Sequence, residues 1–199
     1  MGQADLFSYL SAFVTIVLAV ALTDMIQSTH RLIRARHRVK WDALPLLFAA
    51  IIAVAVVSEF FSIWSVLAIT QVSMPRLLWM LAVPTMFALL AYSVLPDEIP
   101  AEGIDLTAFY FSERRVWSVM FAAASLFDMA RSIESLASHG SSVVHYFQFV
   151  WVSEFIGLVG MGTMFFARSR RWSWVGVLLL SGDVLFGTIG WTIRAKAGA

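Results

Sequence analysis

The chain has 199 residues, of which 60% are hydrophobic and 14% are charged, and its formal net charge is +1. Soluble domains contain about 45–50% apolar and about 25% charged residues, so this composition excludes a soluble globular protein, a disordered chain and a basic nucleic-acid-binding protein. The absence of cysteine also excludes disulfides, thiolate metal sites and iron–sulfur clusters. An integral membrane protein built of helices remains, in agreement with the mean hydropathy of +0.80.

Long apolar stretches recur along the whole chain. A helix that crosses a bilayer needs about 20 mostly apolar residues. The stretches predict an all-α fold, a bundle of six transmembrane helices that forms a single domain over residues 1–199. No basic residue precedes the first stretch, so we interpret it as a helix and not as a signal peptide. The expected spans cover residues 6–28, 43–69, 74–95, 115–137, 144–167 and 172–193.

Lysine and arginine residues set the expected orientation. They gather between spans one and two, at the start of span four, and between spans five and six, which all fall on one side of a six-span bundle. By the positive-inside rule this side is cytoplasmic, and both termini are expected on the outer, periplasmic side. The basic residues of this side are Arg31, Arg34, Arg36, Arg38, Lys40, Arg114, Arg115, Arg168, Arg170 and Arg171.

Residues near the span ends give further local expectations. The segment 96–113 is the longest connection, and its Asp105 is expected to cap a helix. Tryptophans near span ends are expected at the membrane interface, with plain packing as the alternative. These tryptophans are Trp41, Trp117, Trp172, Trp174 and Trp191.

Ionisable residues inside the expected spans are the feature that bears on function. A charge near the bilayer centre costs a few kcal/mol, so it usually faces the bundle interior and is paired or protonated. From a rise of about 1.5 Å per residue, four acids and one arginine fall within roughly 8 Å of their span centres and share one layer. Asp24 and Glu134 fall nearer to span ends. The residues of the layer are Glu59, Asp128, Arg131, Glu154 and Asp183.

Small residues near these acids indicate an interior position. Gly176, Asp183 and Gly187 recur on one face of the sixth span, which favours close helix packing. Asp128 and Arg131 are three residues apart and can form an ion pair along one helix.

Two main interpretations of this layer stay open, beside a site for a polar lipid head group or an organic ligand. In the first, Arg131 pairs with Asp128 or Glu134, the other carboxyl groups are protonated and hydrogen-bonded across helices, and the layer is structural. In the second, the acids outnumber the base and form a site or pathway for a proton, a cation or a small cationic solute. The second interpretation predicts a transporter or channel. The alternative function is a non-catalytic subunit or a ligand-sensing module of a larger membrane complex.

No motif indicates an enzyme. Serine-hydrolase, zinc-protease and nucleotide-binding motifs are absent from the sequence. The four histidines lie outside the span centres, so no haem or metal site is predicted and no cofactor is identified. The expected partners are the lipid bilayer and either further copies of this chain or subunits of a membrane complex, without nucleic acid. An intramembrane lipid-modifying enzyme is the weakest alternative, because only carboxylates are available.

Two short similarities link the halves of the chain. LTDMIQSTHRL at residues 22–32 is similar to LFDMARSIESL at residues 126–136, and VSEFF at 57–61 is similar to VSEFI at 152–156. A repeat of three spans must be inverted, and inverted 3+3 repeats are a recurrent plan of transporters. Chance similarity between apolar segments is the alternative.

Two stretches resemble a known group of sequences. They are FSYLSAFVTIVLAVALTDMIQSTHRLIRARHRVKW at residues 7–41 and DLTAFYFSERRVW at residues 105–117. Both resemble bacterial hypothetical membrane proteins that have six expected spans and no assigned activity. The resemblance implies a location in the bacterial inner membrane and supplies no catalytic residues.

Overall fold

The structure is a computed structural model that describes residues 3–62, 74–138 and 151–189. Within these ranges the chain is mostly helical, as the sequence predicts. Three parts of the expected spans lie outside the described residues. They are the last residues of the second span, the first residues of the fifth and the last residues of the sixth. The helices are α1 (Gln3–Arg34), α2 (Ala43–Ser62), α3 (Met74–Ser93), α4 (Leu106–Ser138), α6 (Trp151–Phe166) and α7 (Arg170–Ile189).

Two of the described helices are long and apolar enough to cross a membrane, namely α2 and the Ser8–Arg34 part of α1. The apolar parts of α3 and α6 are shorter there, Met80–Ser93 and Glu154–Phe166. Helices α4 and α7 are less apolar because charged residues interrupt them. The described helices therefore support two candidate spans, and the six-span plan stays a prediction.

Helix α1 carries its apolar residues on more than one face. Val14, Leu18 and Ala21 follow each other at helical spacing and are buried. Phe13 and Ile16 on other faces of the same helix are more than half exposed. A large exposed apolar surface marks a site of contact with a partner or with a membrane.

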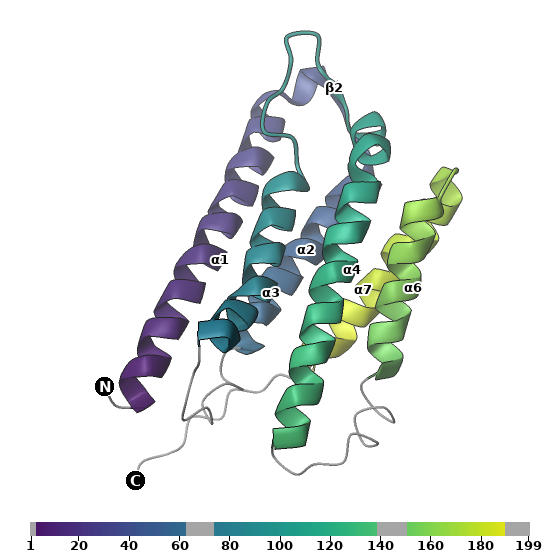
Figure 1. The fold of residues 1–199 in the computed structure, drawn as a ribbon. Helices are drawn as coiled ribbons and strands as arrows, with labels where there is room; N and C mark the ends of the chain where they lie inside the picture. Colours follow the sequence, from purple (N-terminus) through teal and green to yellow (C-terminus); the bar gives the residue numbers. More distant parts are fainter. Residues whose placement is uncertain (1–2, 63–73, 139–150, 190–199) are drawn as a thin grey trace.

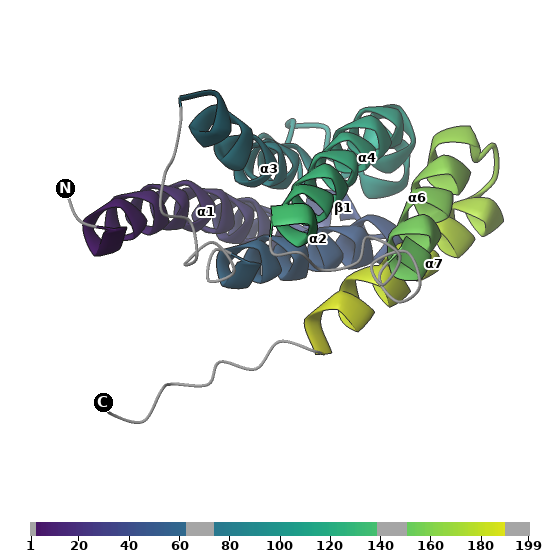
Figure 2. The same ribbon diagram turned by 60° about the horizontal axis from the view of Figure 1, so that its bottom comes forward.

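The helices form two rows that run side by side (Figures 1 and 2). Helices α3, α4 and α6 make one row, and α1, α2 and α7 make the other. Neighbours within each row are in contact. The rows are joined by contacts of α1 with α3, of α6 with α7, and of α2 with α3 and α4. Helices α6 and α7 pack tightly as a hairpin. The connections 35–42, 94–105 and 167–169 lie together at one end, which we call the basic end (Figure 1).

Helix α4 starts nine residues before the expected fourth span, and the bounds of the span itself stay a prediction. Asp105 supplies the physical reason. Its Oδ1 accepts hydrogen bonds from the backbone N–H groups of Thr107 (2.9 Å) and Ala108 (3.2 Å), which caps the helix as predicted. Charged residues that follow the cap interrupt the apolar sequence, but helix α4 continues through them.

A short parallel pairing joins two connections at the basic end. Strand β1 (Val39–Lys40) pairs with β2 (Ile104–Asp105), and the 3-10 turn η1 (Arg36–Arg38) precedes β1. Gly103 has a φ of 95°, and a Cβ there would lie 2.3 Å from the carbonyl oxygen of Arg38. Only glycine therefore permits this close approach.

Asp42 connects three elements at the basic end. Its Oδ1 accepts hydrogen bonds from the Leu44 N–H (3.0 Å) and from Nη2 of Arg170 (2.7 Å), and its Oδ2 accepts one from Oγ1 of Thr107 (2.7 Å). Burial by itself raises the pKa of Asp42, but these hydrogen bonds and the Arg170 charge lower it below the ordinary value of 3.8. The buried carboxylate therefore links the start of α2 to α4 and α7. We call Asp42, Thr107 and Arg170 the Asp42 cluster.

Trp117 lies in the core near the basic end. Its side chain is fully buried, and its ring stacks on Phe48 with 5.3 Å between ring centroids. The indole N–H donates to the carbonyl oxygen of Ser93 at 3.2 Å. The expected interfacial position was therefore wrong for Trp117, and the packing alternative holds, because this residue lies on the face of α4 that contacts Phe48 of α2 and Ser93 of α3.

The other tryptophans differ from Trp117. Trp41 and Trp172 are 47% and 61% exposed, and their interfacial position stays a prediction. Trp174 is partly buried, and Trp191 lies outside the described residues.

Candidate functional site

A cavity of about 160 Å³ lies among α2, α4, α6 and α7, with one side chain of α3 in its wall. Four of the five predicted site residues line it, so the structure brings together acids from four helices. We call this space the acid cavity. Its carboxylates are those of Glu59, Asp128, Glu154 and Asp183.

Helix α2 turns one polar face toward the acid cavity. Ala55, Glu59 and Ser62 are four and three residues apart, so they share a face, and all three line the cavity. Glu59 is buried. The Ser62 hydroxyl donates to the Glu59 backbone carbonyl at 2.8 Å. The three-residue spacing of Glu59 and Ser62 on one helix thus places both residues at the same site.

Helices α6 and α7 approach closely because glycines face each other. A Cβ on Gly160 would lie 2.9 Å from the carbonyl oxygen of Gly176, and a Cβ on Gly176 would lie 2.8 Å from that of Gly160. The small-residue face that the sequence predicts for α7 is confirmed at Gly176. The surroundings of Gly187 lie outside the described residues, so the small-residue face stays a prediction at that position.

The Asp183 carboxylate packs against Gly157 of the neighbouring helix. A Cβ on Gly157 would lie 2.2 Å from Oδ2 of Asp183, well inside van der Waals contact. The missing side chain at residue 157 therefore leaves the space that the carboxylate of α7 occupies. This contact fixes Asp183 at the wall of the acid cavity.

The acids of the cavity act on one another electrostatically. The Glu154 carboxylate lies close enough to Asp128 and Asp183 for repulsion when all are ionised. Like charges that share a site disfavour full ionisation, and a bound proton or cation relieves the repulsion. No lysine, arginine or histidine is among the described residues that line the cavity.

Arg131 was the predicted counter-charge of this layer. It belongs to α4, three residues after Asp128, but its side chain lies outside the described residues. Its pairing with Asp128 therefore stays a prediction. The Glu134 side chain is likewise not described.

Asp24 does not line the acid cavity. Its Oδ2 is buried and accepts no hydrogen bond from a described residue. Arg31 and Asp97 act on it electrostatically, which places it toward the basic end. This position agrees with the expectation that Asp24 stands apart from the acid layer.

Aromatic and hydroxyl groups complete the wall of the cavity. Phe87 of α3 and Phe121 of α4 meet edge to face, with ring centroids 5.6 Å apart. Ser58 of α2 and Ser125 of α4 also line the space. Sequence reasoning missed the two phenylalanines, because α3 carries no acid beside Phe87 and only the contact between helices brings these rings to the carboxylates.

Among the described residues, no group of three or more His, Asp or Glu side chains is arranged to hold a metal ion. The chain matches no protein-family model, no curated protein and no solved structure. The acid cavity is thus the feature from which a function can be argued, and the resemblance to bacterial six-span proteins stays a prediction.

Proposed function

We propose that the chain is a transporter or channel of the bacterial inner membrane that passes protons, cations or a small cationic solute through the acid cavity. The observation that carries the proposal is the convergence of four carboxylates from four helices on one space. Intramembrane acids that face a common cavity are the usual elements of ion and proton pathways.

The size and the polar lining of the acid cavity favour small cationic species. A space of about 160 Å³ holds a few water molecules, and serine hydroxyls beside the carboxylates can bind them. Water and carboxylates together form a route along which a proton moves by short steps. Because the described acids form no metal-binding group, a proton or a hydrated monovalent cation fits better than a tightly held metal ion.

The membrane arrangement belongs to the same proposal. It takes all six helices as spans, the basic end as cytoplasmic and both termini as periplasmic. The support comes from the two apolar helices and from the position of three basic or capped connections at one end of the bundle (Figure 1). An inverted repeat of three spans is compatible with this plan and is not required by it.

Flux through reconstituted protein tests the proposal. Proteoliposomes with wild-type protein are compared with Asp183→Asn and Glu154→Gln for H⁺, Na⁺ and K⁺ movement, driven by a potassium gradient and valinomycin for H⁺ and by ion gradients for the others. The neutral amides cannot take up a proton or balance a cation. We expect flux to fall by about tenfold or more, which corresponds to only ~1.4 kcal/mol in the barrier.

Asp97→Asn is the matched control, because Asp97 is an exposed acid at the basic end and does not line the cavity. It is expected to keep wild-type flux. Undiminished flux in both amide variants would refute the pathway. Absence of flux in well-folded wild type would favour the alternative of a non-catalytic or ligand-sensing subunit, whose partners would then be sought by purification from native membranes.

A further inference from the structure

A second space lies away from the acid cavity, between α1 and α2 at the basic end. It is an apolar groove of about 510 Å³. Helix α1 lines it with residues between Leu22 and Ile33, helix α2 with residues between Leu46 and Ala53, and Leu95 also contributes to the wall. We call this space the α1–α2 groove.

Small side chains on α2 leave the groove open. Ala49, Ala50 and Ala53 line it at helical spacing and face Met25 and Ile26 of α1. The side chain of alanine is a single methyl group, which is too small to fill the space between the two helices. Helix α1 instead makes its more extensive contact with α3. The groove is therefore a lasting feature of this packing.

The groove has the length of one bilayer leaflet. Leu22 and Ile33 are eleven residues apart in α1, which corresponds to about 16 Å along the helix axis. Half of the hydrocarbon core of a bilayer is about 15 Å thick. An extended acyl chain of a phospholipid in the leaflet at the basic end thus matches the groove in length and polarity.

Positive charge gathers at the outer end of the groove. His30 lines it, and Arg34 follows four residues later on the same face of α1. Arg34 and Arg36 are exposed, and no described residue forms an ion pair with either. They are thus available to an anion from outside the chain.

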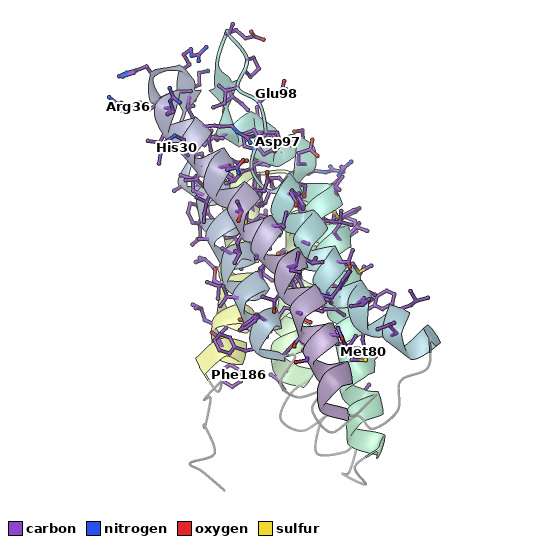
Figure 3. The ribbon with its side chains drawn as sticks, turned by 90° about the vertical axis from the view of Figure 1, so that its left-hand side faces the viewer. His30, Arg36, Met80, Asp97, Glu98 and Phe186 are labelled. Atoms are coloured by element: carbon purple, nitrogen blue, oxygen red, sulfur yellow. The ribbon has the colours of Figure 1, made fainter. Side chains whose placement is uncertain are left out.

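Acids of the neighbouring connection lie on the other side of α1. Arg31 binds there, with its Nη1 2.6 Å from the Asp97 carbonyl oxygen and 3.8 Å from Oδ1 of Asp97. Figure 3 shows His30 and Arg36 on one side of the end of α1, and Asp97 and Glu98 on the other. The groove side of the helix end therefore stays cationic.

We propose that the α1–α2 groove binds an anionic phospholipid, with one acyl chain along the alanines of α2 and the phosphate against His30, Arg34 and Arg36. Basic residues just outside a membrane helix attract anionic head groups, and the groove adds a fixed place for the chain. This inference rests on the membrane location in the proposed function but not on transport.

Lipid binding to the full chain in a neutral detergent tests the inference. Phosphatidylglycerol and phosphatidylcholine of equal chain length are titrated, and binding is measured by native mass spectrometry and by the rise in melting temperature. Wild type is expected to prefer phosphatidylglycerol. Each removed arginine should weaken that binding about fivefold, so R34Q/R36Q should lose most of the preference. R171Q removes an exposed charge of α7 at the same end and is the matched control.

Filling the groove provides an independent variant. A50L places a larger side chain in the groove from an exposed position, and A19L places the same side chain at an exposed position of α1 outside it. A50L should weaken phosphatidylglycerol binding while A19L should not.

The results separate the parts of the inference. Unchanged lipid preference in both R34Q/R36Q and A50L would overturn it. Loss in R34Q/R36Q with unchanged binding in A50L would show attraction to the surface alone and would overturn the groove as the site. Stabilisation by inorganic phosphate equal to that by the lipid would also overturn it, because the acyl chain would then be unnecessary. None of these results depends on flux through the acid cavity.

Discussion

Removing the carboxylate of the Asp42 cluster is expected to destabilise the whole basic end. In Asp42→Ala, the Leu44 N–H loses its acceptor at the start of α2, and Thr107 and Arg170 lose their shared partner. The contact with Leu44 stabilises the start of α2, and the contacts with Thr107 and Arg170 join that end of α2 to α4 and α7. The effect should therefore appear in global unfolding and not in one helix alone.

The magnitude follows from the surroundings of each contact. A helix N-cap contributes about 1 kcal/mol, and a hydrogen bond to a charged group contributes about 1.5–3 kcal/mol. The Arg170 side chain is 56% exposed, so its ion pair contributes less than about 1 kcal/mol. The variant should thus lose about 3 kcal/mol of unfolding free energy.

The dependence on pH has a defined sign. Because the pKa of Asp42 is lower in the folded state than its ordinary value of 3.8, the unfolded state binds the proton more tightly. The contribution of Asp42 is complete above about pH 4 and is lost as pH falls below that value through the folded-state pKa. Wild type and Asp42→Ala should therefore converge in stability as the pH falls below 4.

Equilibrium unfolding in mixed micelles, followed by circular dichroism between pH 3 and 7, measures both effects. Asp97→Ala is the control, because its ion pair with Arg31 is 3.8 Å long and both side chains are substantially exposed. It should change stability by less than about 0.5 kcal/mol. Equal stability of wild type and Asp42→Ala at pH 7 would refute the reasoning.

Two further substitutions test the packing directly. Gly157→Ala puts a Cβ 2.2 Å from Oδ2 of Asp183 and should displace that carboxylate and lower flux severalfold in the proteoliposome assay. Gly162→Ala in the same helix meets nothing within 4 Å and should leave flux unchanged, and equal flux in the two variants would contradict the assigned role of Gly157. Trp117→Ala empties a fully buried site and should cost about 3–5 kcal/mol in unfolding free energy, whereas the exposed Trp41→Ala should cost less than about 0.5 kcal/mol. Similar losses for both tryptophans in the same unfolding measurement would argue against the buried position of Trp117.

Much of the candidate site was accessible from sequence, for a definite reason. Acids are rare in apolar helices because their burial is costly, so Glu59 and Asp183 stand out in otherwise apolar runs. Their depth follows from residue counting, which placed four acids in one layer. The glycine face of α7 indicated the side on which Asp183 packs, and the contact with Gly157 agrees with it.

Other parts of the site depend on which helices become neighbours. Phe87 enters the wall of the acid cavity because α3 packs against α4, and nothing in its own segment indicates this. Trp117 was expected at the interface because it lies near the start of the expected fourth span, but its contact with Phe48 of α2 places the indole in the core.

The sequence by itself determined the helical class, the concentration of positive charge in particular connections and the layer of acids. These properties follow from hydropathy and helical spacing, which are local. Only the tertiary structure decided that acids of α2, α4, α6 and α7 line one cavity and that α1 and α2 leave a groove beside the basic end. The reason is that cavities form where small and large side chains of different helices meet, and the partners in such contacts are set by the packing of the whole bundle.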